Sequence, residues 1–247
     1  MNRNEDINNQ DIQKDGKEKK TSLRSEIISW IQIIVAALVI AFFLNNFIIA
    51  NSTIPTGSMK DTIMEGDRVM GLRLAYTFGE PERGDIAIFD FGWICPNCKT
   101  AMGEGEAPET CPLCGESIGR ADTLYYVKRV IGLPGDKIEI RAEGSVKASE
   151  ITEAPPGSLA GVPEDAELVT AAVYVNGEKL DESYVKEPML YTGDQDFEVP
   201  EGCYFMLGDN RNNSEDARYW NDPYIPEDRM LAKVYFRYWP GIKWLDD

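Results

Sequence analysis

The hydrophobic and polar positions divide the chain into one long apolar stretch and a remainder of short apolar runs. No residue from 27 to 50 is charged, and Ile, Val, Ala, Leu and Phe fill most of these positions. About twenty such residues in a helix cross the hydrocarbon core of a bilayer. We therefore expect a transmembrane helix over residues 27–50. The polar residues 1–26 before it are expected to form a disordered tail.

A cleavable secretory signal is a competing interpretation of the apolar stretch, because the residues after Ile49 are small and polar. The stretch is longer than the apolar core of a signal peptide, about 7–15 residues, and Trp30 suits an interfacial anchor, so we favour a retained helix. A buried core helix would not explain the basic residues that precede it: Lys17, Lys19, Lys20 and Arg24. The positive-inside tendency places the tail in the cytoplasm and the chain from about Asn51 outside, as a single-pass protein of the cytoplasmic membrane.

The portion after the span, residues 51–247, has the pattern of an all-β domain. Runs rich in β-branched and aromatic residues recur between Gly, Pro and Asp, at residues 85–91, 123–132, 137–141, 172–175, 202–207 and 230–238. Asn176-Gly177, between residues 172–175 and 178–180, is the preferred pair for a type I′ hairpin turn. Two stretches interrupt the pattern. One is the cysteine-bearing insert of residues 92–121, and the other, residues 142–170, is expected to be a surface loop.

Composition narrows the function. The chain has 247 residues, 43% of them hydrophobic, which is enough for a substantial core and one or two domains. Its net charge of −17 would repel phosphate backbones, so nucleic acid is a poor partner. It contains no histidine. Mechanisms that need an imidazole, including Ser-His-Asp and Cys-His catalysis and His-ligated catalytic metals, are therefore excluded.

Three segments carry the candidate chemistry. Residues 51–60 follow the span and contain Ser58, residues 125–136 place Lys128 in an apolar strand, and residues 208–218 are rich in Asp, Asn and Arg. In this order, behind a membrane anchor, the segments resemble the type I signal peptidases, the Ser/Lys proteases that remove signal peptides from exported proteins. The resemblance covers most of the chain after about residue 27, apart from the two interruptions.

The resemblance implies roles for individual residues. Ser58 would be the nucleophile and Lys128 the general base, and Thr56 would form the oxyanion hole together with the backbone N–H of Ser58. Ser214 would orient the lysine by a hydrogen bond. Four residues would hold the scaffold of the site, for which we favour a stabilising ion-pair network over a chemical role: Asp209, Arg211, Asp216 and Arg218.

The sequence departs from the family pattern at two places, and one segment matches a structural element. Lys60-Asp61-Thr62-Ile63 stands where the family often has a proline-containing run, and Ala217 replaces a frequent serine. Residues 66–69, Gly-Asp-Arg-Val, match a family segment that is mainly structural. Lys60 is a second candidate base, but we expect it to be solvated because it follows Ser58 by only two positions.

The chemistry agrees with the resemblance. A serine hydroxyl is a weak nucleophile and needs a base, and a lysine can serve only if burial makes it lose its proton near neutral pH. Val127, Val130 and Ile131 supply an apolar setting for Lys128, whereas the acidic exterior would act in the opposite direction. A serine near a turn or a lysine in a strand is ordinary by itself, so only their joint setting indicates a protease. No metal or other cofactor is needed for this reaction.

The place of Ser58 along the chain suits a membrane substrate. It lies about eight residues beyond the span, so it cannot be more than roughly 30 Å from the membrane surface. A signal peptide held in the bilayer presents its cleavage site at this height. We expect the substrate to pair as an extended strand and to carry Ala or another small residue at the first and third positions before the cut. The expected partners are signal peptides, membrane lipid and the secretion translocon.

The insert contains a separate motif. Its cysteines follow a CxxC-x12-CxxC pattern, and two such knuckles can close on one tetrahedral Zn²⁺: Cys95, Cys98, Cys111 and Cys114. Two disulfides are the alternative, which an outward-facing compartment would permit. We favour a structural zinc ribbon that folds a loop without a core of its own, over a docking surface for a partner. Cys203, in an apolar strand, is expected to be a small buried residue.

Two other functions remain open. A self-cleaving regulatory Ser/Lys protease would share the dyad, but it would lack a membrane anchor and would need its own cleavage segment. An inactive relative that serves as a membrane-anchored zinc-ribbon scaffold would not need both Ser58 and Lys128.

Overall fold

A computed structural model describes residues 23–155 and 157–245 of the chain. It forms two compact units that divide after Phe43. The first contains the helix α1, Leu23–Phe43, which continues through a short π-helical turn, Leu44–Ile48. Together Arg24–Ile48 are long and apolar enough to cross a membrane. The predicted single apolar helix is therefore present.

The ends of this helix differ from the sequence prediction. Residues 23–26, which we assigned to the tail, are helical, and residues 1–22 lie outside the described part of the chain. At the other end, Ile49 and Ala50 belong to the first strand instead of the span. Ala50 is only 4% exposed, in the core of the second unit. An apolar residue at the end of a span and an apolar residue in a buried strand look alike in sequence, which explains the difference.

The second unit is built on two antiparallel sheets. The larger sheet has the order β1-β2-β13-β3-β5-β11-β12, while β14 pairs with β13 and β4 pairs with β3. The predicted all-β fold is confirmed. The strands of this sheet are β1 Ile49–Thr53, β2 Arg68–Leu72, β3 Ile86–Ile94, β4 Ala101–Glu104, β5 Asp122–Gly132, β11 Cys203–Leu207, β12 Tyr224–Pro226, β13 Met230–Trp239 and β14 Lys243–Trp244.

The smaller sheet has the order β10-β6-β7-β8, and β9 also pairs with β7. Asn176 and Gly177 both have positive φ, 54° and 84°, between β7 and β8, as the predicted type I′ turn requires. The expected surface loop is shorter than residues 142–170, because β6 and β7 pair across both of its ends and leave residues 148–166 as the connection. The strands are β6 Lys137–Lys147, β7 Glu167–Val175, β8 Glu178–Lys179, β9 Met189–Leu190 and β10 Gln195–Glu198.

Helical structure in this unit is confined to short segments. Besides the π-helical turn Leu44–Ile48, they are α2, Leu74–Phe78, and three 3-10 turns, Ala148–Glu150, Arg211–Asn213 and Glu227–Arg229. The turn Arg211–Asn213 comes three residues after β11 and lies within the Asp-, Asn- and Arg-rich segment of the candidate site.

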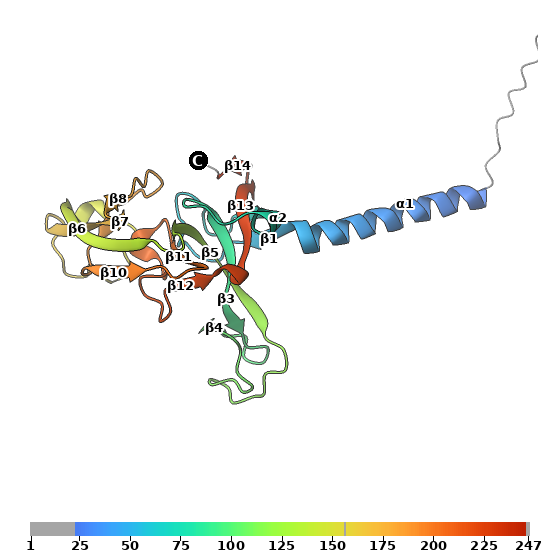
Figure 1. Cartoon of the computed structure of the whole chain (residues 1–247), viewed down its shortest axis with the longest axis horizontal. Coiled ribbons are helices and arrows are strands. Elements are labelled where there is room, and N and C mark those ends of the chain that lie inside the picture. Colours follow the sequence, from blue (N-terminus) through green and yellow to red (C-terminus); the bar gives the residue numbers. More distant parts are fainter. Residues whose placement is uncertain (1–22, 156, 246–247) are drawn as a thin grey trace, which may run out of the picture. The chain divides into compact units, whose positions relative to one another are not determined.

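Two apolar cores hold the sheets together. The main core joins residues of both sheets, among them Phe89, Ile131 and Phe205 of the larger sheet and Ile138 and Val173 of the smaller one. A second core lies around β1, β2 and β13. Strands β3 and β5 extend beyond the cores as a long hairpin that carries β4 and the cysteine insert, at the lower end of Figure 1.

Candidate active site and cysteine cluster

Ser58 lies in the connection between β1 and β2. The residues around it alternate between buried and open positions, and Ile54, Met59 and Ile63 are at most 4% exposed in the second core. Backbone bonds close the turn, from Lys60 N to Gly57 O at 3.0 Å and from Ile63 N to Met59 O at 2.7 Å. Ser58 itself is partly exposed. The loop is thus anchored on both sides of a serine that a substrate can reach.

Lys128 lies on β5, opposite Ala87 of β3, and is only 4% exposed. Burial lowers the pKa of Lys128 from 10.5 to about 8, because the ammonium loses its hydration. The negative charge of Asp216 acts in the opposite direction, and the positive charge of Arg218 adds to the lowering of the pKa. The ammonium also lies 5.6 Å from the centre of the Tyr126 ring. The predicted burial of the amine is therefore present.

The segment of residues 208–210 connects the serine loop to the lysine strand. It follows β11, which pairs with β5 next to Lys128. The backbone N of Asn210 donates to Ser58 O at 3.1 Å, and its side-chain Nδ2 donates to Gly57 O at 3.0 Å. A Cβ on Gly208 would lie 2.5 Å from Ser58 O and 2.2 Å from Ser214 Oγ, so only glycine permits this close approach.

Ser214 lies at the same junction. It is 8% exposed, and its Oγ finds no hydrogen-bond partner among the described residues. Buried hydroxyls almost always have a partner. The hydrogen bond from Ser214 to the Lys128 amine, which the resemblance implied, is not formed in this structure. Thr56 lies exposed two residues before Ser58.

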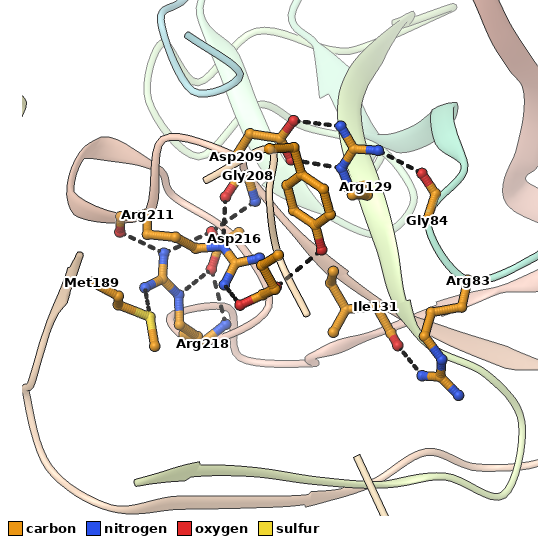
Figure 2. Close-up of polar contacts among 12 residues, drawn as sticks. Arg83, Gly84, Arg129, Ile131, Met189, Gly208, Asp209, Arg211, Asp216 and Arg218 are labelled. Atoms are coloured by element: carbon orange, nitrogen blue, oxygen red, sulfur yellow. Dashed lines mark hydrogen bonds and ion pairs between the residues drawn. The ribbon is translucent and has the colours of Figure 1, made fainter. Parts of the chain in front are cut away.

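Asp209 joins both halves of the site through Arg129, the residue after the lysine. Figure 2 shows the guanidinium of Arg129 bound to both oxygens of Asp209, at 2.8 and 2.6 Å, and to Gly84 O at 2.7 Å. Thr62 Oγ1 donates to the same carboxylate at 2.6 Å. Since Thr62 belongs to the serine loop, Asp209 ties this loop to β5.

A second buried ion pair lies beside the first. Asp216 accepts hydrogen bonds from Gly208 N at 3.0 Å and from Arg218 Nε at 2.7 Å. Burial by itself would raise the pKa of Asp216, but the charge of Arg218 holds that pKa below its ordinary value. Arg211 donates to Gly208 O at 3.0 Å and pairs with Glu182. All four predicted scaffold residues thus lie in one network around residues 208–218.

Several residues of this network were not singled out from the sequence. They are Asn210, Thr62, Glu182 and Tyr184, whose ring lies 3.9 Å from the Arg129 guanidinium carbon. The side chain of Lys60 is 36% exposed, so it stays in contact with solvent as expected, but its ammonium also forms an ion pair with Glu153 that the sequence did not predict. A signal for Asn210 existed in the predicted segment 208–218, but nothing local in the sequence points to Glu153.

The four cysteines of the insert converge. Their sulfur atoms all lie within 4.8 Å of one another, with 3.9 Å between Cys95 and Cys114 and between Cys98 and Cys111. Sulfur ligands at about 2.3 Å from a tetrahedral Zn²⁺ lie about 3.8 Å apart, so the cluster has the size of a zinc site. A disulfide needs about 2.05 Å, and all four residues are free thiols.

The two cysteine pairs have the same local backbone. Cys95 N donates to Thr100 O and accepts Lys99 N at its carbonyl, and Cys111 has the same pair of bonds to Glu116 and Gly115. The residue after each second cysteine has positive φ, 58° at Lys99 and 73° at Gly115. Trp93 and Ile118 form a small core with the two buried cysteines. The insert is therefore a symmetric pair of turns with almost no apolar core.

An apolar helix that can span a membrane, a β-sheet unit, an accessible serine and a buried lysine amine are together the features of a membrane-anchored protease of the Ser/Lys class. Comparison with known proteins agrees. The family model described as "Signal peptidase, peptidase S26" matches residues 27–151 and 158–239. The chain is 28% identical to a probable signal peptidase I-2 of Synechocystis, over 86% of this chain and 74% of that protein. It is 29% identical to a signal peptidase IB of Staphylococcus aureus, over 88% and 92% of the two chains.

A signal peptidase I of Pseudomonas aeruginosa is 31% identical over 78% of this chain and 63% of that protein. The chain belongs to the signal peptidase family, peptidase S26. It is a serine endopeptidase.

Proposed function

We propose that Ser58 and Lys128 form the catalytic dyad with which this signal peptidase removes signal peptides from exported pre-proteins. The observation that carries the proposal is that Lys128 is only 4% exposed and has a pKa of about 8. Its strand, β5, pairs with β11, and the segment 208–210 that follows β11 is hydrogen-bonded to the serine loop. A large fraction of this amine is neutral in slightly alkaline solution, so it can accept a proton.

The reaction follows from these positions. Ser58 Oγ attacks the carbonyl carbon at the cleavage site while Lys128 Nζ takes the hydroxyl proton. The backbone N–H of Ser58 and the hydroxyl of Thr56 stabilise the oxyanion. The ammonium then protonates the leaving amine of the mature protein, and the signal peptide remains as an ester on Ser58. Lys128 activates a water molecule, which hydrolyses the ester.

The edge of β5 supports an extended substrate. Residues 122–128 of β5 pair with β3 on one side, and β11 pairs with the other side only from Arg129 onward. Among the described strands, none pairs with the remaining edge. A peptide added there as a strand would lead directly to Lys128, and small side chains at the first and third positions before the cut would fit beside the strand.

Replacement of the dyad residues tests the function. Ser58→Ala and Lys128→Met, assayed in detergent with a pre-protein, should each lower kcat by at least about 10³-fold, since only binding and oxyanion stabilisation would remain. Ser52→Ala, in the same segment, and Lys137→Met, an exposed lysine, serve as matched controls and should retain full activity. Unchanged turnover in Ser58→Ala would favour the scaffold function instead.

The cysteine cluster supports a structural zinc site, and Cys95, Cys98, Cys111 and Cys114 would be its ligands. Zinc bound there would fix two turns that bury few apolar residues, and it would take no part in the peptide cleavage. Metal analysis of purified protein should find about one zinc per chain, which Cys111→Ser removes and Cys203→Ser retains. Metal-free protein with two disulfides would contradict this assignment.

The lysines before the span support an orientation with the N-terminus in the cytoplasm and the β-sheet unit on the outer face of the cytoplasmic membrane. In this orientation Ser58 reaches pre-proteins as they leave the secretion translocon, with membrane lipid around the anchor. The short connection between Ile48 and Ser58 keeps the nucleophile near the surface where a signal peptide ends.

A further inference from the structure

The connection between β6 and β7, residues 148–166, reaches the serine loop through one carboxylate. Glu153 forms an ion pair with the Lys60 ammonium, two residues after Ser58. Its second oxygen, Oε2, lies 3.4 Å from Asn210 Nδ2. The side chains of this ion pair are only partly exposed, 36% for Lys60 and 19% for Glu153. Glu153 therefore contacts both the serine loop and the segment 208–210.

Both contacts of Glu153 lead to the backbone of the nucleophile. Lys60 closes the turn around Ser58, because its backbone N donates to Gly57 O. Asn210 holds the carbonyls of Gly57 and Ser58. A single carboxylate thus connects the two groups that fix the backbone on either side of Ser58.

Glu153 is itself held in place. Its backbone N donates to Glu187 Oε2 at 3.1 Å, and Thr152 N donates to Glu187 Oε1 at 2.9 Å. Asn212, in the 3-10 turn after β11, also bonds to Glu187 and receives Leu190 N at 2.8 Å. Through Glu187, the connection of residues 148–166 is therefore hydrogen-bonded at Thr152 and Glu153 and linked to Asn212 of the candidate site.

We propose that Glu153 is a positioning residue for the nucleophile, and that the pair Lys60–Glu153 locks the serine loop against the connection of residues 148–166. The proposal rests on the proposed role of Ser58. It concerns a feature of this chain in particular, because the family match leaves out residues 152–157, where Glu153 lies.

The expected effect is on the chemical step. An error of about 1 Å in the position of a reacting group can lower a rate by about a hundredfold. Loss of one of several restraints on the loop should cost less, about three- to tenfold in the rate of acylation. KM should change less than about twofold, because the substrate edge of β5 makes no contact with this pair.

The experiment measures single-turnover acylation of the full chain in detergent, with a pre-protein substrate. Glu153→Gln and Lys60→Met should each slow acylation, and the double variant should be no slower than either one, because both remove the same interaction. Lys60→Arg and the charge exchange Lys60→Glu/Glu153→Lys should restore the rate. The apparent pKa of the rate should stay the same, since Glu153 is not among the groups that shift the pKa of Lys128.

Glu143→Gln is the matched control, because Glu143 forms an exposed ion pair with Lys179 on the smaller sheet. This variant should acylate at the normal rate. The proposal is overturned if Glu153→Gln acylates normally, if the two single effects multiply in the double variant, or if the charge exchange gives no recovery. Ser58→Ala separates the two claims. If Ser58→Ala stays active, Ser58 is not the nucleophile and the proposed function is wrong. If Ser58→Ala is inactive but Glu153→Gln acylates normally, only the positioning role of Glu153 is wrong.

Discussion

At the scale of single residues, the central feature is a lysine kept out of water. Burying an ammonium is unfavourable, so the pKa of Lys128 is lowered and the amine loses its proton more easily. The nearby negative charge of Asp216 partly stabilises the charged form. Arg218 opposes the attraction that Asp216 exerts on the amine, because it binds the same carboxylate at 2.7 Å. The Asp216–Arg218 pair thus keeps the pocket polar without fixing the lysine in its charged form.

The lysine should therefore cost stability. A shift of its pKa from 10.5 to about 8 corresponds to about 3 kcal/mol. Because the folded-state pKa is the lower one, this loss is complete below about pH 8 and disappears as the pH rises to about 10.5. Lys128→Met should be inactive but more stable than the natural protein at pH 7, with a difference that shrinks toward pH 10. Thermal unfolding in detergent across this pH range would show it, and a less stable variant at pH 7 would contradict it.

Gly208 should tolerate no side chain. An added Cβ would lie within 2.6 Å of three atoms: the carbonyl oxygen of Ser58 and the Oγ and Cβ atoms of Ser214. Gly208→Ala should lower kcat about a hundredfold and destabilise the fold by about 1–3 kcal/mol. Gly241→Ala, whose added Cβ meets no atom within 4 Å and whose φ is not positive, is a control for the loss of a glycine. Normal kcat in Gly208→Ala would show that the serine loop does not depend on this contact.

The residues predicted from the sequence and those found only in the structure differ in a physical way. Ser58 and Lys128 could be proposed from the joint setting of three segments behind an apolar helix, although neither residue is distinctive alone. Asn210 and Glu153 could not, because their contacts join positions 153 and 93 residues apart. The Lys60–Glu153 ion pair could not be predicted for the same reason, since Glu153 lies in the connection between β6 and β7.

At the scale of elements, long apolar strands were predictable and short polar ones were not. Strands β3, β5, β11 and β13 carry runs of buried apolar residues, and the sequence predicted all of them near their observed bounds. Residues 142–147 of β6 and 167–170 of β7 were predicted as loop. Their exposed polar residues and a positive φ at Gly144, near a register shift, hide the strand pattern.

The cysteine insert is the element most dependent on a ligand. Its core contains only Trp93, Ile118 and two cysteines among buried residues. Glu104 of β4 also accepts hydrogen bonds from Asn221 N and Asp222 N, which attaches the insert to the main unit. Removal of zinc should leave the β-sheet unit folded but unfold the two cysteine turns of the insert.

Chelation should therefore make the chain sensitive to protease between about residues 95 and 114, while the rest of the β-sheet unit resists cleavage. Added zinc should restore protection in the natural protein and not in Cys111→Ser. Equal resistance with and without chelator would show that the insert folds without a metal.

At the scale of the whole molecule, charge is distributed unevenly. The six basic and six acidic residues among the first 26 positions cancel, so the portion after the span carries the net charge of −17. A strongly acidic catalytic unit would be repelled by anionic lipid headgroups, and the anchor is then what keeps the site near its substrate. This balance agrees with an active site that must stay close to the membrane.

The proposed orientation rests on the Lys and Arg residues just before the span, and it can be tested by protease accessibility. Protease added outside intact spheroplasts should digest the β-sheet unit, and a tag at the N-terminus should become accessible only after lysis. Cleavage of the N-terminal tag in intact spheroplasts would reverse the proposed topology. A control protein known to lie in the cytoplasm should stay intact until lysis.

The most direct test of the dyad is the titration of the Lys128 amine itself. NMR of the full chain in detergent, with ¹³C at the lysine ε position and Lys128→Met to assign the signal, follows this group as the pH changes. The predicted midpoint is about 8, as burial requires, and the rate of cleavage should rise with pH through the same value. A midpoint at 10 or above, with activity already complete at pH 7, would contradict a buried amine as the base.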